Sequence, residues 1–258
     1  QCDSNWINVG FAQVDAQTGA YSVEVPINKR PVRLMVDGRG IITNVYGRAA
    51  SSTPGTLEEA TTITTYQDIS GLDIEVLAKP TVSGTISFPE AALAASPIGT
   101  EAATVTLWAY SQPDEENGWP GGWQWQDSQT FFTGQLATST AYSIPTMPGT
   151  YRVSVSSYWT GQTFYGGSSL STATDLTVDF GQSVTADITT SLLPQVAGTL
   201  TPPEGRELDT DITVVLVRLP ETIPTDGPWE PVDMAFGYVG ADGRFAIPAA
   251  AGDYALIA

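Results

Sequence analysis

The sequence repeats itself, and this feature limits the folds open to it more than any other. Val82-Ser83-Gly84-Thr85-Ile86 returns 114 residues later as Val196-Ala197-Gly198-Thr199-Leu200. Tyr142-Ser143-Ile144-Pro145 returns as Phe245-Ala246-Ile247-Pro248, and the same spacing separates each from a following Gly-x-Tyr. Self-similarity with a period near 110 residues indicates serial domains, one per repeat, rather than a single large domain around one pocket.

A weaker third copy opens the chain. Gly19–Pro26 resembles the segment that ends in Ile-Pro, Tyr46-Gly47 matches Tyr165-Gly166, and Leu72-Asp73-Ile74 matches Ala186-Asp187-Ile188. No segment ahead of this copy matches the Val-x-Gly-Thr strand that begins the other two.

These matches predict three domains. Residues 1–79 form the C-terminal part of a β-sandwich repeat, 80–194 a complete repeat, and 195–258 the N-terminal part of a third. Proline-marked junctions at 77–80 and 192–195 connect them with little slack, which favours stiff coupling. Two explanations of the end domains stay open: the sequence is an excerpt of a longer surface protein, or copies complete one another by strand addition into a head-to-tail filament.

Strand patterns dominate the complete repeat. Apolar and polar residues alternate over 104–110, 151–156, 176–180 and 184–188, which is typical of half-buried antiparallel strands. Turn residues separate these runs, and only 89–95 is suited to a short helix. We therefore predict an all-β fold of tandem Ig-like β-sandwiches.

The motifs resemble a known family. The Val-x-Gly-Thr-Ile strand, the Thr104–Leu107 strand, and the Tyr-Ser-Ile-Pro segment followed by Pro148–Val155 are similar to carboxypeptidase regulatory-like domains. These domains are related to transthyretin-like folds and to the B-type repeats of bacterial collagen adhesins. The resemblance implies a Greek-key sandwich of about seven strands, found in tandem in secreted and surface proteins and rarely catalytic.

Covalent cross-links have few candidate residues. The adhesin relatives often carry a Lys–Asn isopeptide bond, but the lysines here are Lys29 and Lys79, and none follows residue 79. Cys2 is the single cysteine, so no disulfide forms within the chain. It is an unpaired thiol, a bridge to another chain or a lipid anchor, and the sequence leaves these three open.

Composition excludes several functions. A net charge of −18 repels phosphate backbones, so we expect no nucleic-acid partner. The absence of histidine excludes Ser-His-Asp and Cys-His mechanisms and histidine-ligated metals. Paired carboxylates remain chemically open, but none stands in a distinctive signature, and we expect no catalytic residue. No apolar run is long enough for a membrane span.

The loop predicted for residues 113–127 is rich in tryptophan, glycine and acid, and a related loop lies near residue 229. Its tryptophans could cover one end of the sandwich, contact a partner protein, or stack on sugar rings. The candidate binding residues are Trp119, Trp123, Trp125, Trp229, Asp114 and Asp127.

One acidic cluster is a candidate calcium site. Glu207, Asp209 and Asp211 supply hard oxygen ligands, although their spacing does not match the twelve-residue calcium loop. Solvated surface charge is the competing explanation. Apart from calcium, we expect no cofactor.

The sequence as a whole predicts a non-catalytic, extracellular structural or adhesive module at the cell surface, within a stalk or a filament. Its expected partners are neighbouring repeats or copies of the same chain, and a glycan or a host surface protein. A carbohydrate-binding module is the alternative.

Overall fold

The computed structural model describes residues 6–26, 31–64, 66–95, 101–202, 212–219, 233–240 and 242–257. The regular structure of the described residues is almost all β-strand, as the sequence predicts, and their one α-helix is the short α1 (Glu90–Ala95). It divides into two compact units, Gln1–Lys79 and Pro80–Ala258. No helix in the described residues is long and apolar enough to cross a membrane.

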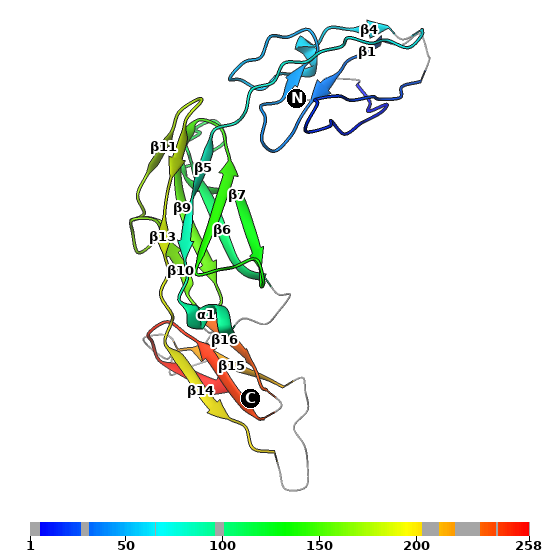
Figure 1. Ribbon diagram of the computed structural model, residues 1–258. Helices are drawn as coiled ribbons and strands as arrows, with labels where there is room; N and C mark the ends of the chain where they lie inside the picture. Colours follow the sequence, from blue (N-terminus) through cyan, green and yellow to red (C-terminus); the bar gives the residue numbers. More distant parts are fainter. Residues whose placement is uncertain are drawn as a thin grey trace. The chain divides into compact units, whose positions relative to one another are not determined.

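Residues 80–194 fold into a β-sandwich of two sheets (Figure 1). The larger sheet has the order β10-β9-β6-β7, and β11 also pairs with β9. In the smaller sheet β5 is central, with β8 on one side and β12 and β13 in succession on the other. The strands of the larger sheet are β6 (Glu101–Ser111), β7 (Gly122–Phe132), β9 (Gly149–Ser157), β10 (Gly161–Phe164) and β11 (Leu176–Val178). Those of the smaller sheet are β5 (Thr81–Ser87), β8 (Ser139–Pro145), β12 (Ser183–Thr185) and β13 (Ile188–Thr189).

The core of this sandwich confirms the predicted strand faces. Leu107 on β6 is paired with Val153 on β9, and neither is exposed to solvent. Ile144 on β8 and Val82 on β5 cover them from the smaller sheet within one apolar cluster. The prediction for Phe180 was wrong, because β11 ends before it, the chain turns at a glycine with φ of +75°, and the ring is 40% exposed.

The first and last strands of this repeat are neighbours that run parallel. Thr81 of β5 is opposite Ser183 of β12, and Ser87 is opposite Thr189 of β13. Between β12 and β13 the Asp187 carboxylate replaces a backbone acceptor, taking hydrogen bonds from the Thr85 amide and hydroxyl, both at 2.8 Å. The hydrogen bond from the Thr85 amide has the larger effect and the one from its hydroxyl the smaller, and together they hold the pKa of Asp187 below its ordinary value. The stabilisation is therefore complete at neutral pH and is lost only as pH falls through the lowered, folded-state pKa.

Gly84 and Tyr142 form a cross-strand pair in the middle of the smaller sheet. A Cβ at Gly84 would lie 2.2 Å from the carbonyl oxygen of Ala186, so only glycine fits this position. The Tyr142 side chain reaches over the glycine and donates a 2.6 Å hydrogen bond to that same carbonyl oxygen. One tyrosine thus links β8 to the last strand across β5, and its burial raises the pKa of the phenol.

Residues 195–258 repeat the beginning of this arrangement around a separate apolar cluster that includes Val214, Leu216 and Ile247. In this segment β14 pairs with β17, and a second sheet has the order β16-β15-β18. The strands are β14 (Gln195–Thr199), β15 (Thr213–Arg218), β16 (Asp233–Tyr238), β17 (Arg244–Pro248) and β18 (Tyr254–Ile257).

The two segments share a tyrosine contact. Tyr151 donates to the carbonyl oxygen of Met147 at 2.7 Å, and Tyr254 donates to that of Ala250 at 3.0 Å. Each tyrosine stands two residues after a glycine and bonds back to the backbone four residues upstream. The contact resembles the tyrosine corner of Ig-like sandwiches and fixes how the chain enters the strand.

Residues 1–79 hold little regular structure. The described pairs are β1 (Pro31–Val32) with β4 (Ile63–Thr64), and β2 (Met35–Val36) with β3 (Asn44–Val45). A 3-10 turn, η1 (Leu57–Glu59), lies between β3 and β4. Residues 20–26, which match the Ile-Pro segment of the other repeats in sequence, have no strand hydrogen bonding, although their side chains alternate between exposed and half-buried.

This unit nevertheless repeats specific contacts of the complete sandwich. The amide of Thr61 donates to the carbonyl of Tyr46 at 2.8 Å, and the amide of Thr174 does the same to Tyr165 at the same distance. The glycine after each of these tyrosines lies against the matching threonine hydroxyl. The Tyr21 hydroxyl donates to the carbonyl of Leu72, which is the counterpart of the Tyr142 contact.

A polar network also stabilises the first unit. Asn44 is buried and its amide donates to the carbonyl oxygens of Arg48 and Glu75 at 3.2 and 2.7 Å. The Arg48 guanidinium donates to the Asn44 side-chain oxygen and lies 3.3 Å from a Glu59 carboxylate oxygen. These contacts tie residues 44–59 to one another and to the backbone at Glu75.

Candidate binding surface

An aromatic surface covers the outer face of the larger sheet in the complete repeat. Trp108 on β6 is opposite Trp125 on β7, and Tyr110 is opposite Trp123. Paired residues of an antiparallel ladder share a face, so the four rings lie on the side away from Leu107 and the core. We call Trp108, Tyr110, Trp123 and Trp125 the aromatic face.

A β-bulge creates this arrangement. The register between β6 and β7 shifts between Leu107 and Trp108, leaving Gln126 as the extra residue. Before the bulge Asp127 is opposite Leu107, and after it Trp125 is opposite Trp108. Without the extra residue strict alternation would place Asp127 and Trp125 on the same face. The bulge is what lets every ring of this set share the outer face.

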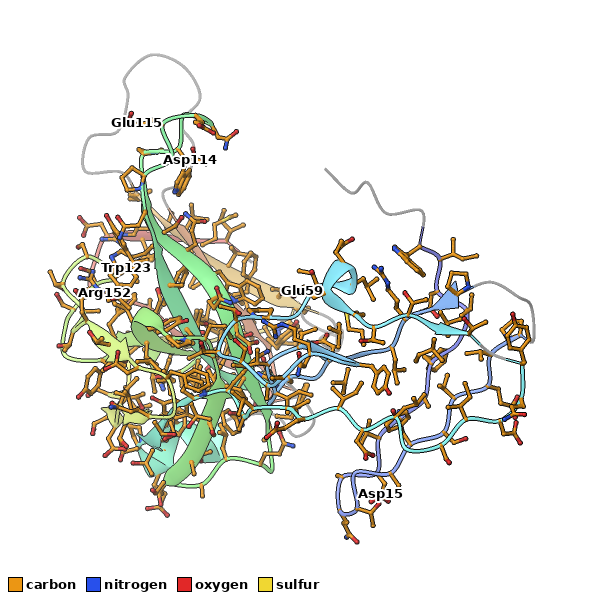
Figure 2. The ribbon with its side chains drawn as sticks, turned by 90° about the horizontal axis from the view of Figure 1, so that it is seen from above. Asp15, Glu59, Asp114, Glu115, Trp123 and Arg152 are labelled. Carbon is orange, nitrogen blue, oxygen red and sulfur yellow. The ribbon has the colours of Figure 1, made fainter. Side chains whose placement is uncertain are left out.

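Arg152 holds the face in place. Its guanidinium carbon lies 4.2 Å from the centre of the Trp123 ring, and Tyr110 meets the same indole edge-on at 5.3 Å between centroids. The Arg152 Nε donates to the Asp175 carboxylate at 2.6 Å, so the cation is paired as well as stacked. Figure 2 shows Trp123 and Arg152 side by side on the sandwich. The charge is thus largely satisfied within the protein, and the surface that remains is aromatic.

Exposure separates a supporting part of the surface from an accessible part. Trp125 is 62% exposed and Tyr110 43%, whereas Trp108 and Trp123 are half-buried. The Trp108 indole nitrogen donates to the Ser154 hydroxyl at 3.0 Å, which fixes its ring. Rigid, exposed aromatic rings suit stacking on the apolar side of a sugar or on a partner's side chains.

The structure corrects the predicted position of two tryptophans. Trp123 and Trp125 belong to β7 and not to a loop, because β7 begins at Gly122. Trp119 does lie in the loop, where its backbone pairs with Asp114 in both directions at 2.8 Å, and its side chain is 38% exposed. The aromatic side chains therefore belong mostly to a rigid sheet.

The two acids predicted beside the tryptophans have other surroundings. The Asp114 carboxylate accepts hydrogen bonds from the side chain of Asn117 and from the amides of Asn117 and Glu116, which hold its pKa below the ordinary value. Figure 2 shows Asp114 and Glu115 on the projecting loop, away from Trp123. Asp127 shares the opposite face with Leu107 and accepts from the Ser128 amide at 2.7 Å. Neither acid stands beside the aromatic face.

The remaining candidate residues, Trp229, Glu207, Asp209 and Asp211, lie outside the described residues. In the part of the chain that the structure describes, no three acidic or cysteine side chains come together as a metal site.

Sequence reasoning missed Trp108, Tyr110 and Arg152 as parts of the surface. The signal was present, because all three occupy outward positions of alternating strands where serine or threonine would be ordinary. What could not be inferred is that β6 is central, with β7 and β9 on either side, which brings the three together.

The fold and this surface define a class: a tandem β-sandwich protein with an aromatic patch on one sheet. No family model matches the chain, and no curated protein matches it. Among solved structures, the structure of the streptococcal ancillary pilin is similar at 13% identity and a TM-score of 0.27, covering 85% of this chain and 62% of that chain. The chain thus spans less than two thirds of that structure's length, and at this TM-score the likeness assigns no function.

Proposed function

We propose that this protein is a non-catalytic module that carries tension in an extracellular stalk or filament. The observation that carries the proposal is the parallel pairing of the first and last strands in residues 80–194. Because β5 and β13 are parallel, the chain enters the sandwich at one end and leaves it at the other. A pulling force then shears the hydrogen bonds of β5 with β12 and β13 together instead of opening them one at a time.

Other features support a structural role over a catalytic one. The chain has no histidine, so the commonest general base is missing. The hydrogen bonds that recur between repeats, such as those of Tyr21 and Tyr142, fix the backbone and not a ligand. The junction after β13 is also tied: the amide of Ala249 donates to the carbonyl of Pro194 at 2.9 Å, and the Tyr158 hydroxyl donates to that of Phe236.

The test is single-molecule pulling of the chain between its two ends. We expect a high-force unfolding event for the complete repeat, and a lower force in Asp187→Asn, since the amide group cannot accept as strongly from Thr85. Asp179→Asn, at a turn outside the parallel pair, is the matched control and should keep the parent force. Equal forces for all three proteins, or unfolding at forces typical of strands opened one by one, would contradict the proposal.

A second candidate function is carbohydrate binding by the aromatic face, supported by the exposure of Trp125 and Tyr110. Exposed indole and phenol rings carried on a rigid sheet can stack on the apolar faces of sugar units in a polysaccharide. This function is compatible with a stalk that adheres along its length.

Trp125→Ala is expected to weaken polysaccharide binding at least about tenfold, which corresponds to about 1.4 kcal/mol. Trp125 is the better substitution, since Trp123 also supports Arg152 and its loss would disturb the sheet. Titration calorimetry against a polysaccharide panel measures the effect, with Phe180→Ala, an exposed ring on a different strand end, as control. If no polysaccharide binds the parent protein, this second function is wrong.

A further inference from the structure

The outer face of the larger sheet continues past the aromatic face as two rows of serine and threonine. Each row crosses the sheet from β7 through β6 to β9, and its residues alternate along the strands with Leu107 and the other core side chains. The rows are Ser128, Thr106 and Ser154, and Thr130, Thr104 and Ser156. We call these six residues the hydroxyl rows. They share one side of the sheet with the four aromatic rings.

Hydrogen bonds join the hydroxyl rows to the aromatic face and to β10. The buried Ser154 hydroxyl accepts from the Trp108 indole nitrogen at 3.0 Å and from the Gln162 side-chain amide at 3.3 Å. Gln162 is exposed and is opposite Ser156, so it extends the polar part of the surface onto β10. Hydroxyl and amide groups both donate and accept hydrogen bonds, which suits them to the hydroxyl groups of a sugar.

This surface is long and runs in the direction of the strands. Tyr110 and Thr104 are six residues apart on β6, and a strand rises about 3.3 Å per residue, so the aromatic and hydroxyl parts together span about 20 Å. That length exceeds a single sugar ring. A linear polysaccharide lying along β6 would stack sugar rings on Tyr110 and Trp125 and place further units over the hydroxyl rows.

The charge around this surface is strongly negative. Residues 80–194 contain nine acidic side chains and one basic side chain, Arg152, for a formal charge of −8. Arg152 is already stacked on Trp123 and paired with Asp175 at 2.6 Å. The Asp175 side chain is 53% exposed, so a cation in solvent can reach a carboxylate at the border of the aromatic face. Such a field repels anionic polymers and attracts cationic ones.

We propose that the aromatic face and the hydroxyl rows bind a linear polysaccharide whose sugar units carry protonated amino groups. The inference rests on the carbohydrate-binding function proposed above, and adds the charge of the ligand and its direction along β6. The same surface already holds one cation, since the Arg152 guanidinium carbon lies 4.2 Å from the centre of the Trp123 ring. Trp125, which is 62% exposed, offers a second indole to an ammonium group of the ligand.

The experiment is titration calorimetry of the whole chain with a glucosamine oligomer, at a pH that protonates its amines, and with the N-acetylated oligomer of the same length. We expect the amino oligomer to bind at least about tenfold more tightly at low salt. Added salt should reduce this preference, because it screens the attraction between exposed charges. Trp125→Ala should weaken the binding of both oligomers, since both use the ring.

Asp175→Asn tests the charge at the border of the aromatic face. The change removes a carboxylate and leaves Arg152 without its partner, so the amino oligomer should bind at least about threefold more weakly and the N-acetylated one within about twofold of the parent. Asp179→Asn is the matched control. It removes the same charge at the other end of β11, away from Arg152, and should keep the preference.

Two outcomes separate this inference from the function on which it rests. Equal binding of the two oligomers by the parent protein overturns the inference and leaves carbohydrate binding in place, whereas binding of neither, nor of any polysaccharide in the panel, overturns both. An oligolysine of the same charge that binds as tightly as the amino oligomer would show that charge alone attracts the ligand, and would also overturn the inference. Should circular dichroism show that Asp175→Asn disturbs the fold, the comparison of the two oligomers on the parent protein still decides.

Discussion

Gly84→Ala is expected to destabilise the 80–194 sandwich by about 3 kcal/mol or more. The added Cβ would lie 2.2 Å from the Ala186 carbonyl oxygen and 3.0 Å from the Tyr142 ring. A backbone carbonyl inside a sheet cannot move without breaking strand pairs, and such overpacking costs about 1–3 kcal/mol. The displaced carbonyl also loses the Tyr142 hydroxyl, leaving a buried donor unsatisfied at a further cost of about 1–3 kcal/mol.

Urea denaturation followed by circular dichroism measures this loss. Gly198→Ala is the matched control, because among the described residues the added Cβ meets the outer end of the Phe245 side chain there and no backbone carbonyl. The control should therefore lose clearly less stability than Gly84→Ala. Equal losses would mean that the close approach of the Ala186 carbonyl does not decide which residue fits.

Leu107→Ala and Leu216→Ala are expected to act on different unfolding transitions. Each leucine is almost fully buried, Leu107 at 0% and Leu216 at 1% exposed, and each belongs to its own apolar cluster. Truncating a buried leucine costs about 2–5 kcal/mol through lost burial and the cavity left behind. If the two clusters are separate cooperative domains, each variant lowers the midpoint of its own transition and leaves the other in place.

Differential scanning calorimetry resolves the two transitions. Thr106→Ala changes the outward neighbour of Leu107 on β6 and should have an effect within about 0.5 kcal/mol. A single transition that both leucine variants shift equally would show that residues 80–258 unfold as one cooperative body, contrary to the predicted boundary at 194.

Much of the complete repeat could be predicted because its information is local. Alternation placed Val105, Leu107, Val153 and Val155 inside, and all four are fully buried. The short helix at 89–95 followed from a run of alanine and leucine after a proline, and it is present as α1. The same reasoning was wrong at Phe180, where a glycine turn ends the strand before the pattern does.

The binding surface could be predicted only in part. The sequence shows three tryptophans close together, Trp119, Trp123 and Trp125. The glycine and acidic residues around them favoured a loop for all three. The bulge opposite Leu107 and Trp108 depends on two strands meeting, so no single strand encodes it. Arg152, which stacks on Trp123, follows it in the chain only after β8, a strand of the other sheet.

The sequence by itself determined the repeat, the strand class and the residues that face inward, because period, turn chemistry and side-chain alternation are properties of neighbouring residues. Only the tertiary structure decided that the first strand lies between β8 and the last strands, with Asp187 bonded to Thr85 across 102 residues of chain. Pairing between distant segments depends on the free energy of the assembled sheets, and many pairings satisfy the same local pattern. The parallel pair that would carry load follows from that assembly.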